Sequence, residues 1–251
     1  MSRLRGILTD PLLSVVMPVY NEAATIEEMI RRVLAVPLRT QLIVVDDCST
    51  DGTRDMLAGL QRELGFTLLL QPENRGKGAA LRTGFGSVRG DLVVIQDADL
   101  EYSPEEFPDL IELICQGRAD VVYGSRFLDR PMTMNVNGIA NRVLTLLTNM
   151  LYGARITDME TAYKMVRKPV FDRLRLECRR FDFEPEITAK LLRCGYSIRE
   201  LPIAYTPRTR EQGKKIKWQD GIVAVRVLFR YRVAPFERIV RGVENVPAKA
   251  S

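Results

Sequence analysis

Short apolar runs alternate with amphipathic helical patterns through the first half of this chain. Runs rich in Val, Ile and Leu occupy residues 14–19, 42–46, 67–70 and 92–96. Their composition is typical of strands that are buried on both faces. Between them, residues 24–35 and 53–64 each place apolar side chains on one helical stripe. Because alternating strands and helices form parallel sheets covered by helices, the sequence predicts an α/β fold.

The second half of the chain is less regular. Strands are expected at 121–123 and within 196–205, and a long apolar stretch at 139–152 lies between them. Residues 206–218, TPRTREQGKKIKW, show no periodicity and are expected to form a basic loop. A helical pattern follows at 223–232.

The composition restricts the chemistry. The chain has no histidine, which excludes histidine triads, bases and metal ligands, so a metal would need oxygen ligands and a base would be a carboxylate. Four separated cysteines, Cys48, Cys115, Cys178 and Cys194, form no C-x-x-C pair and fit reduced thiols in a cytosol-like compartment. No run reaches the roughly 18 apolar residues of a membrane span, and no secretory signal is recognisable, so we expect a soluble or peripheral protein.

The net charge of +5 is unevenly distributed. Residues 201–251 hold 11 Lys and Arg against 4 Asp and Glu, whereas residues 1–200 hold 26 against 28. A basic excess of this kind suits phosphates or anionic lipid, or forms a solvated tail. Both interpretations stay open at this point.

An acidic cluster follows the strand expected at 92–96, in the stretch VIQDADLEY. In an extended segment, Asp97, Asp99 and Glu101 would lie on one face and repel one another, so a cation is expected among them. A calcium loop is excluded because Tyr102 and Pro108 stand where that loop needs Gly and Glu. The favoured interpretation is Mg²⁺ or Mn²⁺ shared with the oxygens of a diphosphate, and the alternative is a turn with helix-capping acids.

Polar residues also follow two other expected strands. Asp46 and Asp47 stand where the second strand ends, and their carboxylates suit the donors of a base and a ribose. The first strand ends in MPVYNE, with Pro18 at an irregular exit, and then Tyr20 and Glu22. Because the carboxyl ends of parallel strands meet at one edge, we expect a single crevice there.

The stretch NRGKGAALRTGFG contains neither GxxxxGK[ST] nor GxGxxG. A P-loop and a dinucleotide-binding turn are therefore poorly supported, and the stretch is expected to begin a helix. Lys77 within it could still reach a phosphate.

Six motifs occur in one order along the chain: PVYNE, VVDDCSTDGT, NRGKGAAL, QDADLEY, GSRF and ITDMETAYK. Together they resemble the family 2 glycosyltransferases, and most of all the dolichyl- and polyprenyl-phosphate mannose or glucose synthases. The resemblance covers about residues 13–220. It implies a GT-A (Rossmann-like), mostly parallel central sheet flanked by helices. We expect a catalytic domain over 1–217 and a C-terminal amphipathic helix and tail over 218–251 as a candidate membrane-facing segment.

The resemblance also implies a set of site residues. The metal would be held by Asp97, Asp99 and Glu101, the last standing where the lipid-phosphate group often has Gln. The nucleotide sugar would contact Pro18, Tyr20, Glu22, Asp46 or Asp47, Lys77, Asp97, Ala98 and Asp99. The acceptor phosphate would be bound by Arg126, Arg142 and Arg210, which together with Asp99 are the expected catalytic residues.

A phosphate acceptor simplifies the chemistry, because a phosphate monoester is already largely ionised at neutral pH and needs no base. The enzyme must instead supply cationic positioning, and arginine forks match phosphate geometry. Asp158 and Glu160 in TDMET stand near the position of the base in relatives with hydroxyl acceptors. A saccharide or protein hydroxyl acceptor therefore remains an alternative.

The expected function is inverting, metal-dependent transfer of a hexose from a UDP- or GDP-sugar to a polyprenyl phosphate. The expected cofactor is Mg²⁺ or Mn²⁺, and no nucleic-acid partner is expected. The basic residues of 206–217 and the following helix would dock the protein on the cytoplasmic face of a membrane. A nucleotide-sugar-binding regulator without turnover is the alternative of another class. The nucleoside, the hexose and the oligomeric state stay open.

Overall fold

The computed structural model describes residues 7–128, 136–208 and 218–241. Within these ranges, seven strands form one sheet with the order β3-β2-β1-β4-β6-β5-β7. The strands are β1 (Leu13–Val19), β2 (Thr40–Asp46), β3 (Thr67–Leu70), β4 (Leu92–Ile95), β5 (Val121–Ser125), β6 (Lys164–Arg167) and β7 (Arg199–Pro202). β6 runs antiparallel to both β4 and β5, and the other pairs are parallel.

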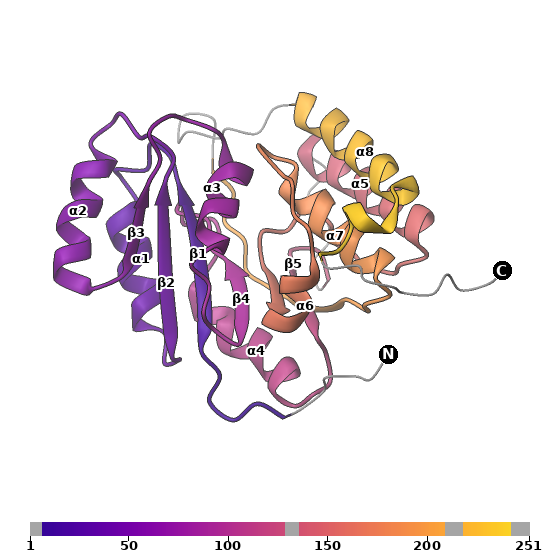
Figure 1. Cartoon of the computed structure of the whole chain (residues 1–251), viewed down its shortest axis with the longest axis horizontal. Helices are drawn as coiled ribbons and strands as arrows, with labels where there is room; N and C mark the ends of the chain where they lie inside the picture. The colour runs from indigo at the N-terminus through magenta and orange to yellow at the C-terminus, as the bar shows by residue number, and fades with distance from the viewer. Residues whose placement is uncertain (1–6, 129–135, 209–217, 242–251) are drawn as a thin grey trace.

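Helices cover both faces of this sheet (Figure 1). One face packs against α1 (Ile26–Ala35), α2 (Thr53–Leu64) and α4 (Phe107–Cys115), the last preceded by the 3₁₀ turn η1 (Pro104–Glu106). The other face packs against α3 (Lys77–Phe85), α6 (Lys168–Arg173) and α7 (Phe183–Arg193). On α7 lies a further pair, α5 (Val136–Tyr152) and α8 (Trp218–Val233), followed by η2 (Phe236–Arg238).

The central strands are buried on both faces, as their unbroken apolar runs predict. In β1, Val15 and Met17 point into the core beneath α1, whereas Val16 points into the core beneath α3. A continuous apolar run is therefore required here, because water reaches neither face. The predicted mostly parallel α/β sheet is confirmed.

The register brings three strand ends to one edge of the sheet. Val19 at the end of β1 pairs with Asp46 at the end of β2, and Val16 of β1 pairs with Ile95 at the end of β4. The residues that follow these strands must then leave the sheet side by side. This edge is the place where the sequence predicts a crevice.

The C-terminal helix packs on the α/β unit. Leu228 and Tyr231 of α8 are buried with Leu144 of α5 and Ala189 of α7. The hydroxyl of Tyr152 also donates to the carbonyl of Leu228 over 2.6 Å. No helix in the described part of the chain combines the length and apolar character that a membrane span needs.

Candidate active site

The three acids after β4 lie close together, but in a turn rather than in the extended segment that the prediction assumes, because β4 ends at Ile95. Leu100 adopts a positive φ of 60°, and the backbone N–H of Glu101 donates to Oδ1 of Asp99 over 3.1 Å. Burial, followed by the negative charges of Asp97 and Glu101, raises the pKa of Asp99 to about 7. A cation placed here would relieve this repulsion.

Lys77, the first residue of α3, provides a cation at the turn. Its Nζ lies 2.9 Å from Oδ1 of Asp97, 3.0 Å from Oδ2 and 3.0 Å from Oε1 of Glu184. Burial alone would lower the pKa of this lysine, but the two carboxylates outweigh burial and raise it. A methyl group at Gly78 would lie 2.7 Å from the backbone N of Arg179, so only glycine lets that neighbouring segment pack against the start of α3.

Arg208 provides a second cation. Its guanidinium donates to Oε2 of Glu22 over 2.7 Å and to the carbonyl of Asp99 over 2.8 Å. The two oxygens of Glu101 accept hydrogen bonds from the backbone N–H of Arg208 (2.7 Å) and the hydroxyl of Tyr205 (3.0 Å). Glu101, expected as a metal ligand, thus holds the segment that follows β7 against the acidic turn.

Asp46 and Asp47 at the end of β2 are both buried, and both shape neighbouring loops. Oδ2 of Asp46 accepts from Nε of Arg54 over 2.8 Å. The carboxylate of Asp47 accepts the backbone N–H groups of Arg75 (2.9 Å) and Gly76 (2.7 Å), which holds the loop before Lys77. Burial raises the pKa of Asp47 despite these hydrogen bonds. Contact of either acid with a nucleoside stays a prediction.

The other residues predicted to contact the donor lie at the same edge. Pro18 is the second-to-last residue of β1 and pairs with Val45 of β2, and Tyr20 follows β1 directly. Ala98, which stands between Asp97 and Asp99 in the sequence, is buried. Their binding of a nucleotide sugar stays a prediction.

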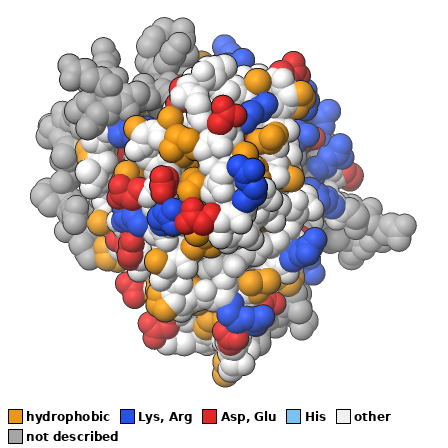
Figure 2. Space-filling view, turned by 90° about the vertical axis from the view of Figure 1, so that its left-hand side faces the viewer, with side chains coloured by type: hydrophobic (Ala, Val, Ile, Leu, Met, Phe, Trp, Pro, Cys, Tyr) orange, Lys and Arg blue, Asp and Glu red, His pale blue; other side chains and the backbone are white. Residues whose placement is uncertain are grey.

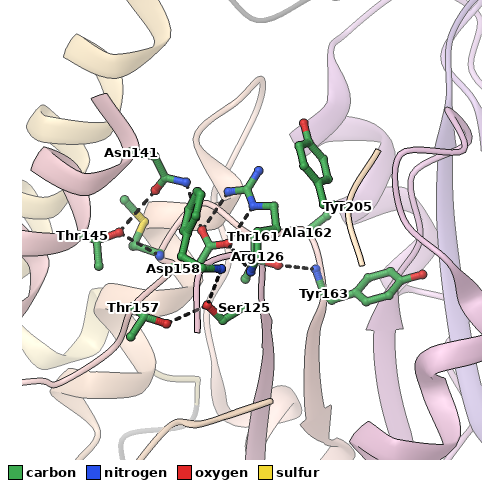
Figure 3. Close-up of polar contacts among 12 residues, drawn as sticks. Ser125, Arg126, Asn141, Thr145, Thr157, Asp158, Thr161, Ala162, Tyr163 and Tyr205 are labelled. Carbon is green, nitrogen blue, oxygen red and sulfur yellow. Dashed lines mark hydrogen bonds and ion pairs between the residues drawn. The ribbon is translucent and has the colours of Figure 1, made fainter. Parts of the chain in front are cut away.

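Arg126 and Asp158 form a buried fork next to this edge (Figure 3). Nε and Nη2 of Arg126 lie 2.7 and 2.8 Å from the two oxygens of Asp158, and the backbone N–H of Arg126 donates to the same carboxylate over 3.1 Å. The guanidinium also stacks 5.1 Å from the ring centroid of Tyr205. Although burial would raise the pKa of Asp158, Arg126 holds it below its ordinary value.

Helix α5 supports this fork. Nδ2 of Asn141 donates to Oδ1 of Asp158 over 3.1 Å, and the hydroxyl of Thr145 donates to Oδ1 of Asn141 over 3.3 Å (Figure 3). Arg142, expected beside Arg126, is instead exposed on α5 and makes no described contact with the fork. Arg210 lies outside the described residues. The acceptor roles of Arg142 and Arg210 stay predictions.

Glu160 and Lys164 are close enough to Arg126 and to each other for their charges to interact. Oε1 of Glu160 is buried and has no hydrogen-bond partner among the described residues. Burial and then the charge of Glu184 raise the pKa of Glu160 to about 7. Burial lowers the pKa of Lys164 to about 8, and its Nζ donates to the carbonyls of Met159 and Thr161.

Sequence reasoning missed three of these residues. Glu184 contacts Lys77 across 107 positions, and Arg208 contacts Glu22 across 186 positions. Arg208 was expected in a basic docking loop, but 13% of its side chain is exposed and its charge is used inside the site. Lys164 lies in β6, a strand that the sequence analysis did not predict. No periodic pattern links Glu184 to Lys77 or Arg208 to Glu22 over such distances in sequence.

The acidic turn fits a divalent cation. Asp97 and Asp99 offer oxygen ligands, which Mg²⁺ and Mn²⁺ prefer, and burial together with the neighbouring carboxylates raises the pKa of Asp99. The described residues hold no preformed group of three metal-ligating side chains. Two carboxylates completed by diphosphate oxygens and water would suffice for Mg²⁺.

Two proteins of related sequence are named as sugar transferases. The chain is 32% identical over 225 residues to the low-salt glycan biosynthesis hexosyltransferase Agl6 of Haloferax volcanii, covering 87% of this chain and 53% of Agl6. It is 33% identical over 210 residues to the undecaprenyl-phosphate 4-deoxy-4-formamido-L-arabinose transferase of Pseudomonas aeruginosa, covering 81% of this chain and 60% of that protein. The chain therefore spans just over half the length of these relatives.

Solved structures share the fold. Glucosyl-3-phosphoglycerate synthase of Mycobacterium tuberculosis, in complex with Mn²⁺, UDP and phosphoglyceric acid, superposes with a TM-score of 0.66 at 21% identity, covering 88% of this chain and 78% of that one. Mannosyl-3-phosphoglycerate synthase of Rubrobacter xylanophilus superposes with a TM-score of 0.69 at 21% identity, covering 91% and 76%. Residues 14–175 match the sequence profile of glycosyl transferase family 2. The chain belongs to that family.

Proposed function

We propose that this protein transfers a hexose from a nucleotide diphosphate sugar to a polyprenyl phosphate, with inversion at the anomeric carbon. Support for the lipid acceptor comes from a relative that is an undecaprenyl-phosphate sugar transferase. Support for the donor comes from the strand ends that meet at one edge of the sheet and from a fold neighbour solved in complex with UDP. The nucleoside and the hexose remain open between UDP- and GDP-linked sugars.

The donor would lie along the strand ends. The nucleoside would contact Tyr20 and Glu22, and its diphosphate would approach Lys77 at the acidic turn. Asp97 and Asp99 would hold Mg²⁺ or Mn²⁺, the metals present in fold neighbours. When bound, the metal would supply positive charge to the leaving diphosphate. Lys77, whose ammonium stays charged, would add to that stabilisation.

The observation that carries the acceptor assignment is the fork between Arg126 and Asp158. Among the described residues Asp158 is the side chain that hydrogen-bonds to Arg126, and it occupies one edge of the guanidinium, which leaves the other N–H groups for a phosphate. Asp158 itself makes a poor base, because Arg126 lowers its pKa. An acceptor that is already ionised suits this arrangement. Its phosphate oxygen would attack the anomeric carbon opposite the diphosphate, and no proton would need to move.

A hydroxyl acceptor is the second candidate function, and Glu160 is the observation that favours it. One oxygen of this carboxyl is buried without a hydrogen-bond partner among the described residues, and its pKa is raised to about 7, which suits a general base at neutral pH. In that case the substrate would be a saccharide or a protein hydroxyl. The two candidates require different acceptors and are separable in one assay.

The test offers UDP- and GDP-hexoses in turn with Mn²⁺, and presents a polyprenyl phosphate or an oligosaccharide as acceptor. We expect a glycosyl phosphate lipid, and its loss when Asp97 and Asp99 are both replaced by Asn. Glycosylation of the oligosaccharide alone would support the second candidate. Peripheral attachment to the cytoplasmic face of a membrane belongs to the same proposal. Residues 209–217, which make up most of the basic loop predicted to dock on the membrane, lie outside the described residues.

A further inference from the structure

Helix α5 carries an exposed apolar stripe that the site does not use. Ile139, Val143, Leu146 and Met150 are between 46% and 74% exposed. Their spacing of four, three and four residues places them on one side of the helix. Asn141, Leu144, Thr145 and Thr148 are buried on the opposite side. We call these four exposed residues the α5 stripe.

Helix α8, the neighbour of α5, carries a second exposed apolar stripe. It packs against α5, and the two helices lie side by side at the upper right of Figure 1. Ile222, Phe229 and Val233 are between 43% and 82% exposed at a spacing of seven and four residues, and we call them the α8 stripe. Apolar side chains exposed in such numbers on neighbouring helices indicate an interaction surface. The flank over α1 and α2, by contrast, mixes acidic, basic and apolar side chains (Figure 2).

The charges around the two stripes identify the partner. Arg142 adjoins the α5 stripe and is the one charged residue of that helix. Arg226 lies within the α8 stripe, and Arg230 and Arg232 are exposed nearby. On α8 the single acid is Asp220, in the first turn. Apolar stripes edged by arginines match an anionic lipid leaflet, which takes apolar side chains between its headgroups and attracts cations.

A second copy of the chain fits this surface less well. A twofold contact through the stripes would bring the same patch of each protomer together. The interface would then gather the arginines beside the stripes of both protomers, and like charges brought together across an interface are unfavourable. We therefore infer that the α5 and α8 stripes dock this protein on an anionic lipid leaflet. This inference rests on the proposed function for its purpose, since a lipid-borne phosphate must reach the site.

The position of α5 connects the surface to the acceptor site. Asn141 contacts the carboxylate that holds Arg126, and it lies on the face opposite the α5 stripe. A helix is about 10 Å across with its side chains, so the fork would lie roughly one helix diameter from the leaflet. A lipid phosphate at the membrane surface is then close to the arginine that we propose as its ligand.

The experiment measures sedimentation of the whole chain with vesicles of phosphatidylcholine, with and without phosphatidylglycerol. We expect binding to the anionic vesicles that falls with salt, and a loss of about tenfold in affinity for Val143→Asp with Leu146→Asp. Ile7→Asp, on a side chain that is 77% exposed elsewhere, is the matched control and should bind like the wild type. Circular dichroism checks that the variants fold.

Two results would overturn the inference. One is wild-type protein that stays in the supernatant at low salt. The other is equal binding by the wild type and the Val143→Asp, Leu146→Asp variant. Dimers in sedimentation velocity that this variant dissociates, without vesicle binding, would assign the stripes to a second copy and also reject the inference.

Transfer assays separate this inference from the proposed function. If both hold, the variant transfers sugar normally to a short-chain soluble prenyl phosphate and about tenfold more slowly to a vesicle-borne one. Wild-type protein that binds anionic vesicles but glycosylates neither acceptor would support docking and contradict the proposed function. Equal slowing on both acceptors would reject docking as the reason for the loss.

Discussion

The ammonium of Lys77 lies between the carboxylate of Asp97, at 2.9 Å, and that of Glu184, at 3.0 Å. This contact joins the start of α3 to the acidic turn after β4 and to α7. The sequence predicts a cation among the acids Asp97, Asp99 and Glu101, and the ammonium of Lys77 lies beside the first of them. Lys77 therefore has two tasks: it neutralises the buried acids, and in our proposal it faces the donor diphosphate.

Replacing Lys77 by Met should destabilise the protein by about 3 kcal/mol, because Glu184 would keep a buried charge without its partner. Equilibrium denaturation in urea measures this change. Lys168→Met is the control, since Lys168 and Asp172 form an exposed pair one helical turn apart. That variant should change stability by less than about 0.5 kcal/mol. Equal effects of the two variants would show that the Lys77 contacts carry no special stability.

The raised pKa of Asp99 predicts a pH dependence of stability in metal-free buffer. The folded state holds the proton up to about pH 7, whereas the unfolded chain releases it near the ordinary value of about 4. Between these values the folded state binds more protons, so this part of the stability is lost as pH rises. The slope from one such group is at most about 1.4 kcal/mol per pH unit.

Asp99→Asn should flatten that slope and raise stability above pH 7, while sugar transfer is lost. Thermal unfolding in EDTA across a pH series measures the slope of stability with pH. The control is Asp109→Asn, on the exposed side of α4. Glu160 contributes a slope of the same sign, so some slope should remain. A slope unchanged by Asp99→Asn would contradict the crowding of charge at the turn.

Arg126→Lys keeps the positive charge but loses the fork that binds Asp158. We expect the Michaelis constant for the phosphate acceptor to rise about tenfold, with little change in nucleotide binding. Arg155→Lys, at an exposed position after α5, should change neither. Initial-rate kinetics with varied acceptor, together with calorimetry of nucleotide binding, measures both. If nucleotide binding were weakened by a similar factor, Arg126 would be assigned to the donor site instead.

Glu160→Gln distinguishes the two candidate acceptors. If a phosphate attacks, no base is needed, and the turnover rate should fall by less than about threefold. If a hydroxyl attacks, loss of the base should cost about 100-fold or more. Single-turnover rates with each acceptor decide between these results. A large loss of turnover with the phosphate acceptor would contradict our account, in which Glu160 takes no part in transfer to a phosphate.

The strand ends of this fold could be predicted from the sequence because they depend on local patterns. The apolar run of β1 is buried on both faces, and Asp97 follows β4 at the edge where Asp46 ends β2. Parallel pairing alone brings such residues together.

Partners distant in sequence could not be predicted. β6 has only four residues, KMVR, and its antiparallel placement depends on both neighbouring strands. The basic run after β7 indicated a surface segment, yet Arg208 turns inward because Glu22 and the carbonyl of Asp99 accept its N–H groups. The direction of this side chain depends on partners that meet only in the folded protein, and the composition of the segment does not reveal them.

The most direct test of the proposed function is the product itself. Purified protein is incubated with Mn²⁺, a UDP- or GDP-hexose and a short-chain polyprenyl phosphate, and the lipid fraction is analysed by mass spectrometry. Our account predicts a polyprenyl phosphate heavier by one hexose residue and inverted at the anomeric carbon, and no such product from the Asp97→Asn, Asp99→Asn variant. Unmodified lipid with every donor, in a reaction where the same protein glycosylates a saccharide, would contradict it.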